Sequence, residues 1–392
     1  MFKNRFYLLT ILLNFVFSDE SRICGTTAPS HEIIESIQLY NENRFNQSPQ
    51  NRELYWVPVQ FHIVQHSNGS GGLNEIILSG IIDDLNMDYI NANIRFYQYA
   101  EVDFILNSDF YEIESDAEIN ELRSINNVEN VIDIYAVPDL SSDNGSICGK
   151  SSFTWYGIQG IVVDNSCFDR FTVNHEVGHY FDLFHPHEDA SGEEFVNGLG
   201  CTVRGDGLCD TPADPKLNED GMVNACIYTG TATDPNGQEY DDCQGYPPCE
   251  LYGGPDIGNI MSYAPDNCVN HFTDEQYEKV EFILHSLRPN YIISPDYVEY
   301  NIEVHSIEDV NGDNDLVINP GEEISLFLNI SIDESWPVGA DEIILTLTTN
   351  EENVNIVLNQ LYLPNLNNGE SIINEEEPFK IQFSSNAEVK DY

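Results

Sequence analysis

The clearest chemical signal in this sequence is a pair of histidines, His175 and His179, with Glu176 directly after the first. In a helix, a spacing of four residues places both imidazoles on one face, where they can bind a zinc ion together. Glu176 would then lie beside the metal, where a carboxylate can take a proton from a metal-bound water. His185 would supply a third ligand if the helix ends near residue 180 and the chain turns back. Three histidines leave the fourth position for water, which is typical of a catalytic zinc site.

The run from His175 to His185, HEVGHYFDLFH, resembles the long zinc motif of the metzincin metallopeptidases. This resemblance implies a tight turn with a methionine further along the chain. Met261 fits that place, because it follows a glycine-rich approach and is one of only four methionines. The resemblance further implies that Met261 forms an apolar floor below the zinc, and that Tyr263 stabilises the oxyanion of the tetrahedral intermediate.

Two further segments narrow the resemblance to the pappalysin family. Residues 205–214, GDGLCDTPAD, look like that family's GD…DTPA stretch, and residues 259–268, NIMSYAPDNC, look like its Met-turn. The resemblance extends over residues 55–287. It implies an α/β (α+β) metzincin-like catalytic domain with a mixed sheet and an active-site helix. It also implies a secreted zinc endopeptidase, generally with bound calcium.

Asp182 stands where the family normally has glycine, at the sharp turn after the helix. A positive φ is favoured at such a turn, and aspartate adopts it at a cost of roughly 1–2 kcal/mol. We therefore expect the turn to form with some strain. The alternative function is a non-catalytic calcium-binding surface adhesin, in which Asp182 leaves the protease scaffold inactive. Zinc content and a Glu176→Gln variant separate the two, because an adhesin would not respond to that substitution.

Asp266 is a candidate for substrate choice. In pappalysins that prefer Arg or Lys after the scissile bond, an acidic residue at the matching place lies at the base of the primed-side pocket. The resemblance implies this role for Asp266, whose carboxylate would pair with a guanidinium or ammonium group. The alternative is a solvated aspartate in the turn of residues 264–267.

Cys24 stands in a polar, Asn-rich stretch, residues 19–53, which is typical of a pro-segment or linker. Some metzincin zymogens, including a pappalysin with a similar Cys-Gly pro-segment, stay latent because a pro-segment thiolate fills the fourth position on the zinc. The resemblance implies such a latency switch for Cys24, which cleavage after Arg44 or Arg52 would release. The alternative is a disulfide between Cys24 and another cysteine.

Nine cysteines in the chain indicate an oxidising compartment. If Cys24 is free, eight remain for four disulfides, and about a hundred pairings are possible. Resemblance to the pappalysins implies one pair, and proximity along the chain suggests the others: Cys226 with Cys268 by resemblance, and Cys148 with Cys167 and Cys201 with either Cys209 or Cys249 by proximity.

Lys3 and Arg5 precede an apolar stretch, which is typical of a secretory signal peptide over residues 1–18. No apolar run is long enough for a membrane-spanning helix. Fifteen Lys and Arg against 67 Asp and Glu give a net charge of −52, and this charge excludes nucleic acid and anionic membranes as partners. We expect a secreted or extracellular monomer that acts on proteins or peptides, and attachment to the cell surface stays open.

Mixed strand and helix patterns over residues 54–292 predict the catalytic domain. Strands are expected at residues 55–64, 94–97, 102–106, 131–137 and 158–163, with helices at 73–89, from Thr172, and after a capping box of Thr273 and Gln276. Residues 186–270 are rich in Gly, Pro, Asp and Cys, which predicts irregular backbone held by cross-links.

Only strand patterns follow, which predicts an all-β sandwich over residues 293–392. Four oxygen side chains stand there at alternate positions, the spacing of a calcium loop: Asp309, Asn311, Asp313 and Asp315. With the Pro-Gly-Glu that follows, they resemble the calcium loop of Ig-like domains attached to bacterial secreted proteases. A solvated Asn/Asp turn is the alternative. The pattern stops abruptly at Tyr392, and whether the chain is a fragment that lacks later domains or a sorting signal stays open.

Overall fold

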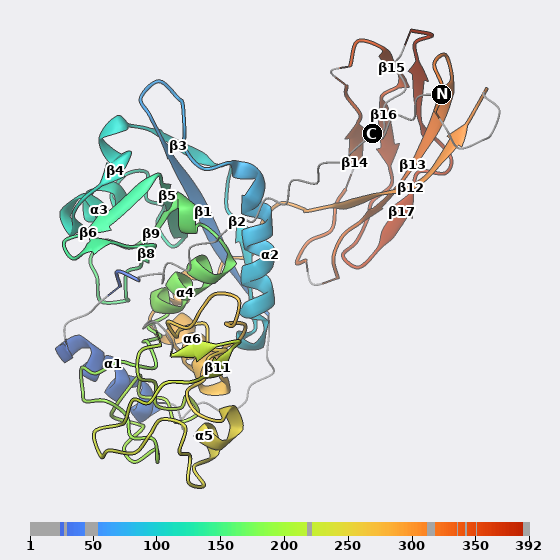
Figure 1. Ribbon diagram of the computed structural model, residues 1–392. Coiled ribbons are helices and arrows are strands. Elements are labelled where there is room, and N and C mark those ends of the chain that lie inside the picture. The colour runs from blue at the N-terminus through green and yellow to red at the C-terminus, as the bar shows by residue number, and fades with distance from the viewer. Residues whose placement is uncertain are drawn as a thin grey trace, which may run out of the picture. The chain divides into compact units, whose positions relative to one another are not determined.

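The computed structural model describes residues 24–26, 30–43, 54–217, 222–311, 318–334, 336–341, 343–349 and 351–386 (Figure 1). The predicted signal peptide and the predicted cleavage sites at Arg44 and Arg52 lie outside the described residues. The chain divides into two compact units, residues 1–53 with 59–292 and residues 54–58 with 293–392. Within the described residues, no helix has both the length and the apolar character to cross a membrane.

A mixed sheet of six strands forms the centre of the first unit. Five strands follow one path, and a sixth also pairs with β1: β2 (Ile94–Gln98), β1 (Tyr55–Gln65), β5 (Ile132–Val137), β9 (Ile161–Asp164) and β8 (Gly149–Lys150), with β3 (Asp103–Leu106) as the sixth. β1 is parallel to β3 and β5, and β5 is parallel to β9, whereas β8 is antiparallel to β9. Every residue of β5 and β9 is buried, as expected where parallel strands are covered on both faces. The predicted strands of this region therefore form, with small shifts at their ends.

Helices cover this sheet. α2 (Leu78–Asp88) packs against β2, and α4 (Arg170–Tyr180) packs against α2, β8 and β9 (Figure 1). An ion pair of Arg170 with Asp88 joins the two helices. α3 (Asp116–Arg123) adds a further apolar cluster with β5. A small three-stranded sheet completes this side: β4 (Glu112–Ile113), β6 (Asp139–Ser142) and β7 (Gly145–Ser146).

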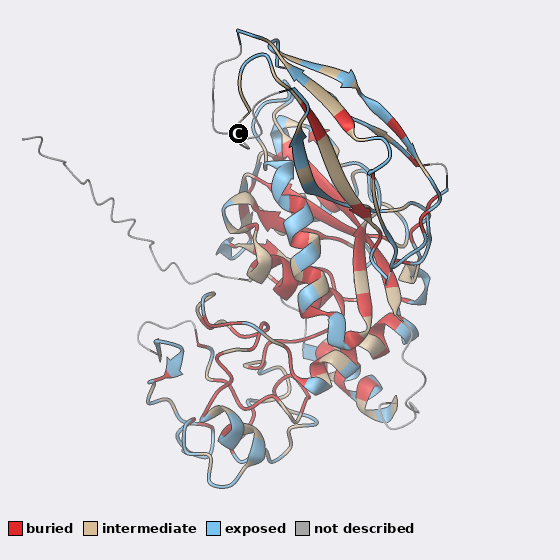
Figure 2. Ribbon diagram, turned by 90° about the vertical axis from the view of Figure 1, so that its right-hand side faces the viewer, coloured by how far each residue is buried: buried red, intermediate tan, exposed pale blue. Residues whose placement is uncertain are grey.

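The helix α4 begins two residues before the predicted start at Thr172. Asp169 is the reason, because its carboxylate accepts hydrogen bonds from the backbone N–H groups of Phe171 and Thr172. These bonds satisfy donors that the first turn of a helix leaves free. All residues from Thr172 to Tyr180 are buried, so the helix that carries the histidine pair lies in the interior (Figure 2).

Residues 186–270 hold little regular structure, as predicted. In the described part of this stretch, only β10 (Val223–Asn224), β11 (Ile227–Tyr228) and α5 (Pro247–Tyr252) occur. The closing helix α6 (Asp274–Ser286) begins with the predicted capping box. Four disulfides cross-link the first unit, and the last of them was not predicted: Cys148–Cys167, Cys201–Cys209, Cys226–Cys268 and Cys243–Cys249.

The stretch predicted to be a pro-segment or linker contains a helix, α1 (Ser30–Asn43). Its buried apolar residues are Ile33, Ile37 and Tyr40, which are only 2–3% exposed. Spacings of four and three residues place these side chains on one face of a helix. Ile33 and Ile37 pack against Phe153 and neighbouring aromatic rings. These apolar contacts anchor α1 to the rest of the first unit.

The second unit is all-β, as predicted. Its described strands form a five-stranded antiparallel sheet and a two-stranded one: β12 (Asn301–Asp309), β13 (Glu323–Ser331), β18 (Phe379–Phe383) and β15 (Val354–Leu358), with β17 (Ser371–Ile373) also on β13, and then β14 (Ile343–Thr346) with β16 (Gln360–Leu363). Apolar residues stand at every second position of β13 from Ile324 to Ile330. They therefore lie on one face of the strand.

Candidate metal centre

Three histidine side chains from the end of α4 and the turn after it meet at one point. The Nε2 atoms of His175, His179 and His185 lie 3.1–3.2 Å from one another. Helix geometry places the first two one turn apart on a single face of α4. His185 reaches the same point because the chain reverses sharply after the helix.

Asp182 makes this reversal possible. Its backbone adopts the left-handed conformation with φ 56°, at the position where glycine is most common. The N–H of Asp182 donates to the carbonyl of His179 at 2.9 Å, and the N–H of Leu183 donates to the carbonyl of Gly178 at 3.0 Å. These are the two hydrogen bonds of a Schellman motif, so the expected turn forms with aspartate in place of glycine.

Backbone carbonyls orient two of the three rings. Nδ1 of His175 lies 2.8 Å from the backbone oxygen of Ile260, and Nδ1 of His179 lies 2.7 Å from that of Leu183. Because a carbonyl only accepts, each Nδ1 carries the proton and each Nε2 keeps a free lone pair. Burial lowers the pKa of His175 to about 4, and it lowers the pKa of His179 and of His185 well below the ordinary value. The imidazoles are therefore neutral, the form that binds metals.

Cys24 adds a fourth donor atom to this cluster. Its Sγ lies 3.3 Å from Nε2 of His179, and the four ligand atoms lie within 4.8 Å of one another. Cys24 is the one cysteine outside a disulfide. Three imidazole nitrogens and one thiolate sulfur make a set of four donor atoms that zinc prefers. The free lone pairs and this donor set fit a zinc ion.

The edge of the central sheet holds Cys24 in this position. Cys24 forms a parallel bridge with Gly149 of β8, and the N–H of Gly25 donates to the Gly149 carbonyl at 2.8 Å. The Tyr263 hydroxyl donates to the backbone oxygen of Cys24 at 3.2 Å. Residues 24–26 therefore lie along β8, directly beside the histidines. Together with α1 they are called the N-terminal segment below.

Glu176 is buried next to the histidine cluster. Its Oε2 accepts a hydrogen bond from the Thr26 hydroxyl at 2.8 Å. Burial raises the pKa of Glu176 to about 7, against the opposing effect of hydrogen bonds from Thr26 and Cys24. Gly149 leaves the space that this carboxylate occupies, because a Cβ there would lie only 2.7 Å from Cγ of Glu176.

Met261 is fully buried against α4. A Cβ at Gly178 would lie 2.4 Å from the sulfur of Met261, so only glycine lets the thioether pack directly on α4. The side chain of Asn259 accepts a hydrogen bond from the Met261 N–H at 2.9 Å and pairs with Gln276 of α6. These bonds fix the turn that presents the methionine.

The aromatic ring of Tyr263 borders the same cluster. Its centroid lies 4.7 Å from that of His185 and 6.2 Å from that of His175. Burial raises the pKa of Tyr263, so its hydroxyl stays protonated and can donate a hydrogen bond. The donation to Cys24 shows that this hydroxyl points toward the position of the N-terminal segment.

The remaining sequence candidates lie elsewhere. Asp266 lies in the turn after Tyr263 and is partly exposed. Asp309 and Asn311 belong to the second unit, where the Asn311 side chain accepts a hydrogen bond from the backbone N–H of Glu323 at 2.8 Å. The other two members of the predicted calcium loop, Asp313 and Asp315, are outside the described residues, so the loop stays a prediction.

Sequence reasoning missed two side chains at this centre, Thr26 and His187. Thr26 is buried on Glu176, and the ring of His187 stacks on that of His185 with centroids 4.8 Å apart. The only available signal for Thr26 was its place two residues after Cys24. His187 follows the third histidine by two residues but falls outside the spacing of the zinc motif.

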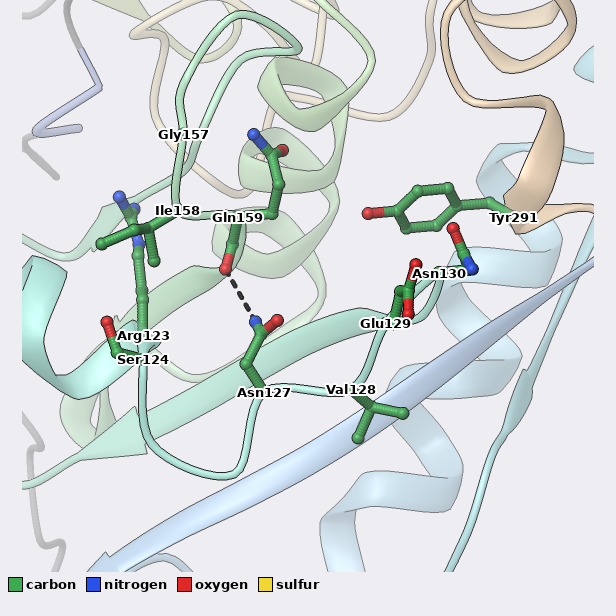
Figure 3. A pocket seen from close by; sticks show the side chains of 10 residues that line it. All are labelled: Arg123, Ser124, Asn127, Val128, Glu129, Asn130, Gly157, Ile158, Gln159 and Tyr291. Carbon is green, nitrogen blue, oxygen red and sulfur yellow. Dashed lines mark hydrogen bonds between the residues drawn. The ribbon is translucent and has the colours of Figure 1, made fainter.

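Figure 3 shows a surface pocket of the first unit. Its lining includes Arg123, Asn127, Gln159 and Tyr291, and the Asn127 side chain donates to the backbone oxygen of Gln159 at 2.9 Å. The pocket contains none of the candidate ligands, so we assign the chemistry to the histidine cluster.

Comparisons with known proteins agree with this assignment. No family model matches the sequence. Two curated relatives are extracellular metalloproteases. The one from Verticillium alfalfae is 27% identical in an alignment of 286 positions that covers 68% of this chain and 92% of that protein. The one from Colletotrichum graminicola is 26% identical in an alignment of 293 positions that covers 69% of this chain and 92% of that protein.

Among solved structures, a promirolysin mutant from Tannerella forsythia has a similar fold. The TM-score is 0.50 at 19% identity, over 69% of this chain and 97% of that chain. This likeness concerns the mixed α/β fold. Together with the metalloprotease relatives and the histidine cluster, it supports a metallopeptidase.

Proposed function

We propose that this chain is a secreted, zinc-dependent endopeptidase of the metzincin class, akin to the pappalysins, that hydrolyses peptide bonds of proteins. The observation that carries the proposal is the convergence of three Nε2 atoms, 3.1–3.2 Å apart, beside the buried carboxylate of Glu176. The extracellular metalloproteases that resemble this chain support the same activity and location.

His175, His179 and His185 would hold the zinc. When bound, zinc lowers the pKa of water and polarises the carbonyl of the scissile bond. Glu176 takes the proton of the attacking water as general base and then donates it to the leaving amine as general acid. The hydroxyl of Tyr263 donates a hydrogen bond to the oxyanion of the tetrahedral intermediate. Met261 supports the metal-binding helix through its contact with Gly178.

The N-terminal segment indicates how an extended peptide would be held. Gly25 donates to the carbonyl of Gly149, and the N–H of Ser151 donates to the Thr26 hydroxyl at 2.6 Å. A substrate strand would use the same backbone groups at the edge of β8, as in other cases of strand addition to a sheet. Both cannot bind at once, so the segment must leave before a substrate enters.

Latency follows from two contacts of this segment. The Cys24 sulfur occupies the place beside the histidines that the attacking water needs. The Thr26 hydroxyl donates a hydrogen bond to the Glu176 carboxylate, which must take the proton of that water. We propose that residues 19–53 are a pro-segment that keeps the enzyme latent, and that cleavage after Arg44 or Arg52 frees the centre.

Three finer features belong to the same proposal. Asp266 would select Arg or Lys after the scissile bond, because a carboxylate pairs with these side chains. Residues 293–392 would form an Ig-like sandwich whose loop from Asp309 to Asp315 binds calcium. The mature chain would act as a monomer.

The alternative, a calcium-binding adhesin with an inactive protease scaffold, rested on Asp182. This residue adopts φ 56° and completes the turn, and the three histidines converge after it. These observations favour the peptidase over the adhesin.

Cleavage of a peptide library by the purified chain tests the proposal. After the pro-segment is removed by limited trypsin digestion, we expect one zinc per chain and cuts that a zinc chelator abolishes. Glu176→Gln should lower kcat by about a thousandfold with zinc retained, because it removes the general base. Glu281→Gln, a substitution on α6, is the matched control. An active Glu176→Gln variant, or a zinc-loaded wild type without cleavage, would refute the peptidase, and cuts without Arg or Lys preference would refute the role of Asp266.

A further inference from the structure

The loop of residues 151–160, which follows β8, borders the metal centre on the side of the N-terminal segment. Its first residue, Ser151, donates its N–H to Thr26. Two residues later, the ring of Phe153 lies 5.6 Å from that of His179, edge to face. Phe153 is 2% exposed and also packs against α1. The loop therefore contacts both a metal ligand and the segment that occupies the centre.

The side chain of Asp182 binds this loop. Its Oδ1 accepts the backbone N–H of Thr154 at 2.9 Å, and its Oδ2 accepts the Thr154 hydroxyl at 2.6 Å. Asp182 is fully buried, so water does not compete for these bonds. Glycine would satisfy the turn after α4 but would leave both donors of Thr154 without this acceptor.

A second link ties the far part of the loop to the same helix end. Arg288 donates from Nε to the Tyr180 carbonyl at 3.0 Å and from Nη2 to the Gln159 side chain at 2.7 Å. Gln159 in turn donates to the carbonyl of Phe153 at 3.3 Å. Gln159 and Tyr291 both line the pocket of Figure 3. With this end already fixed, Asp182 determines the placement of the half of the loop nearest the metal.

We propose that Asp182 is a positioning residue, whose carboxylate fixes Thr154 and thereby the Ser151 N–H and the Phe153 ring beside the metal ligands. This inference rests on the proposed peptidase function. In the latent chain, the fixed loop seats Thr26 and Cys24. In the cleaved chain, the same loop holds the backbone of an extended substrate.

Two substitutions at one position separate the turn from the loop contact. Asp182→Gly favours the left-handed turn and removes the carboxylate. Asp182→Asn also adopts the turn, and it keeps both loop contacts, because its oxygen accepts the Thr154 N–H and its amide donates to the hydroxyl. Thr154→Val removes only the hydroxyl bond and leaves the turn unchanged, so it tests the contact even if Asp182→Gly folds poorly.

The first measurement uses zinc-loaded enzyme with the pro-segment removed and follows zinc content, KM and kcat on one peptide. We expect Asp182→Gly to raise KM by about tenfold and Thr154→Val by about threefold, with one zinc per chain and little change in kcat. Asp182→Asn should stay within about twofold of the wild type. In the double variant, Thr154→Val should add nothing to Asp182→Gly. Loss of zinc in Asp182→Gly, or equal KM for the glycine and asparagine variants, would overturn the proposal.

A second measurement needs no peptidase activity. In the uncleaved, zinc-loaded chain, Cys24 is the one free thiol, and its rate of reaction with a maleimide reports how firmly the segment is seated. We expect the rate to rise several-fold in Asp182→Gly and Thr154→Val and to stay unchanged in Asp182→Asn. Equal rates in all four proteins would overturn the positioning role. If the wild type cleaves nothing, the proposed function fails, and the maleimide rates still decide the role of Asp182.

Discussion

The helix α4 and the N-terminal segment reach the candidate metal centre by different physical means. In α4, His175 and His179 share one face because the helix repeats every three to four residues. Cys24 lies 155 residues from His179 in sequence and arrives there through a strand bridge at Gly149. Helix and turn geometry places the histidines, whereas a strand bridge and side-chain contacts hold Cys24. The proposed latency requires this difference, because the histidines must stay in place when the segment leaves.

The docking has two parts of different chemistry. Cys24 and Thr26 make polar contacts at the centre, and α1 provides an apolar anchor through Ile33, Ile37 and Tyr40. In the proposed latent state, the polar part blocks the reaction, and the apolar part anchors the segment through side chains that are 2–3% exposed. Substitutions in each part can therefore separate blocking from anchoring.

Within the docked segment, the largest expected effect on activity is at Cys24. In the uncleaved chain, Cys24→Ser should raise peptidase activity on the order of tenfold to a hundredfold, because serine is a much poorer zinc ligand than a thiolate. Thr26→Val should raise it by about tenfold, through loss of a hydrogen bond to a carboxylate. Activity on a fluorogenic peptide measures both. After cleavage of the pro-segment, all chains should have equal activity. An uncleaved Cys24→Ser chain as silent as the wild type would show that anchoring alone maintains latency.

The anchor is tested next, by two substitutions on one helix. Ile37→Asp places a charge at a position that is 3% exposed and should cost roughly 2–4 kcal/mol of docking. Leu39→Asp, at a position 40% exposed, should cost less than about 0.5 kcal/mol. The maleimide rate of Cys24 should rise sharply in the first variant only. Equal rates in the two variants would mean that α1 does not anchor the segment.

The smallest expected effect concerns the Met-turn, which packs on α4 through Met261. His271 hydrogen-bonds Asp256 at 2.9 Å, and this bond raises the pKa of His271 against the effect of burial. Its backbone carbonyl accepts the N–H of Ile260, next to Met261. A raised folded pKa means that the stabilisation is complete below the ordinary pKa of histidine and is lost as pH rises through the folded value.

Because His271 is partly exposed, we expect this contribution to be at most about 0.5 kcal/mol. Urea unfolding of the wild type and of His271→Gln should therefore differ more at pH 6 than at pH 9. Parallel stability curves across this range would remove His271 from the account of the Met-turn.

Much of the fold follows from local sequence patterns. The strands of the central sheet, the capping box at Thr273 and the irregular region after α4 all form where the patterns predict them. The start of α4 was wrong by two residues, because Asp169 captures the first turn. The helix α1 was missed, although Ile33, Ile37 and Tyr40 have helical spacing, because the surrounding polar residues are typical of a linker.

The sequence by itself determined what depends on neighbours along the chain: the fold class, the paired imidazoles on one helix face, and the positive φ required after that helix. Only the tertiary structure decided which distant groups meet there. It left Cys24 free beside the histidines, placed Thr26 on Glu176, and gave the side chain of Asp182 a partner in Thr154. Periodicity and turn chemistry act over a few residues, whereas these contacts join segments up to 155 residues apart and depend on how the sheet edge and α4 pack.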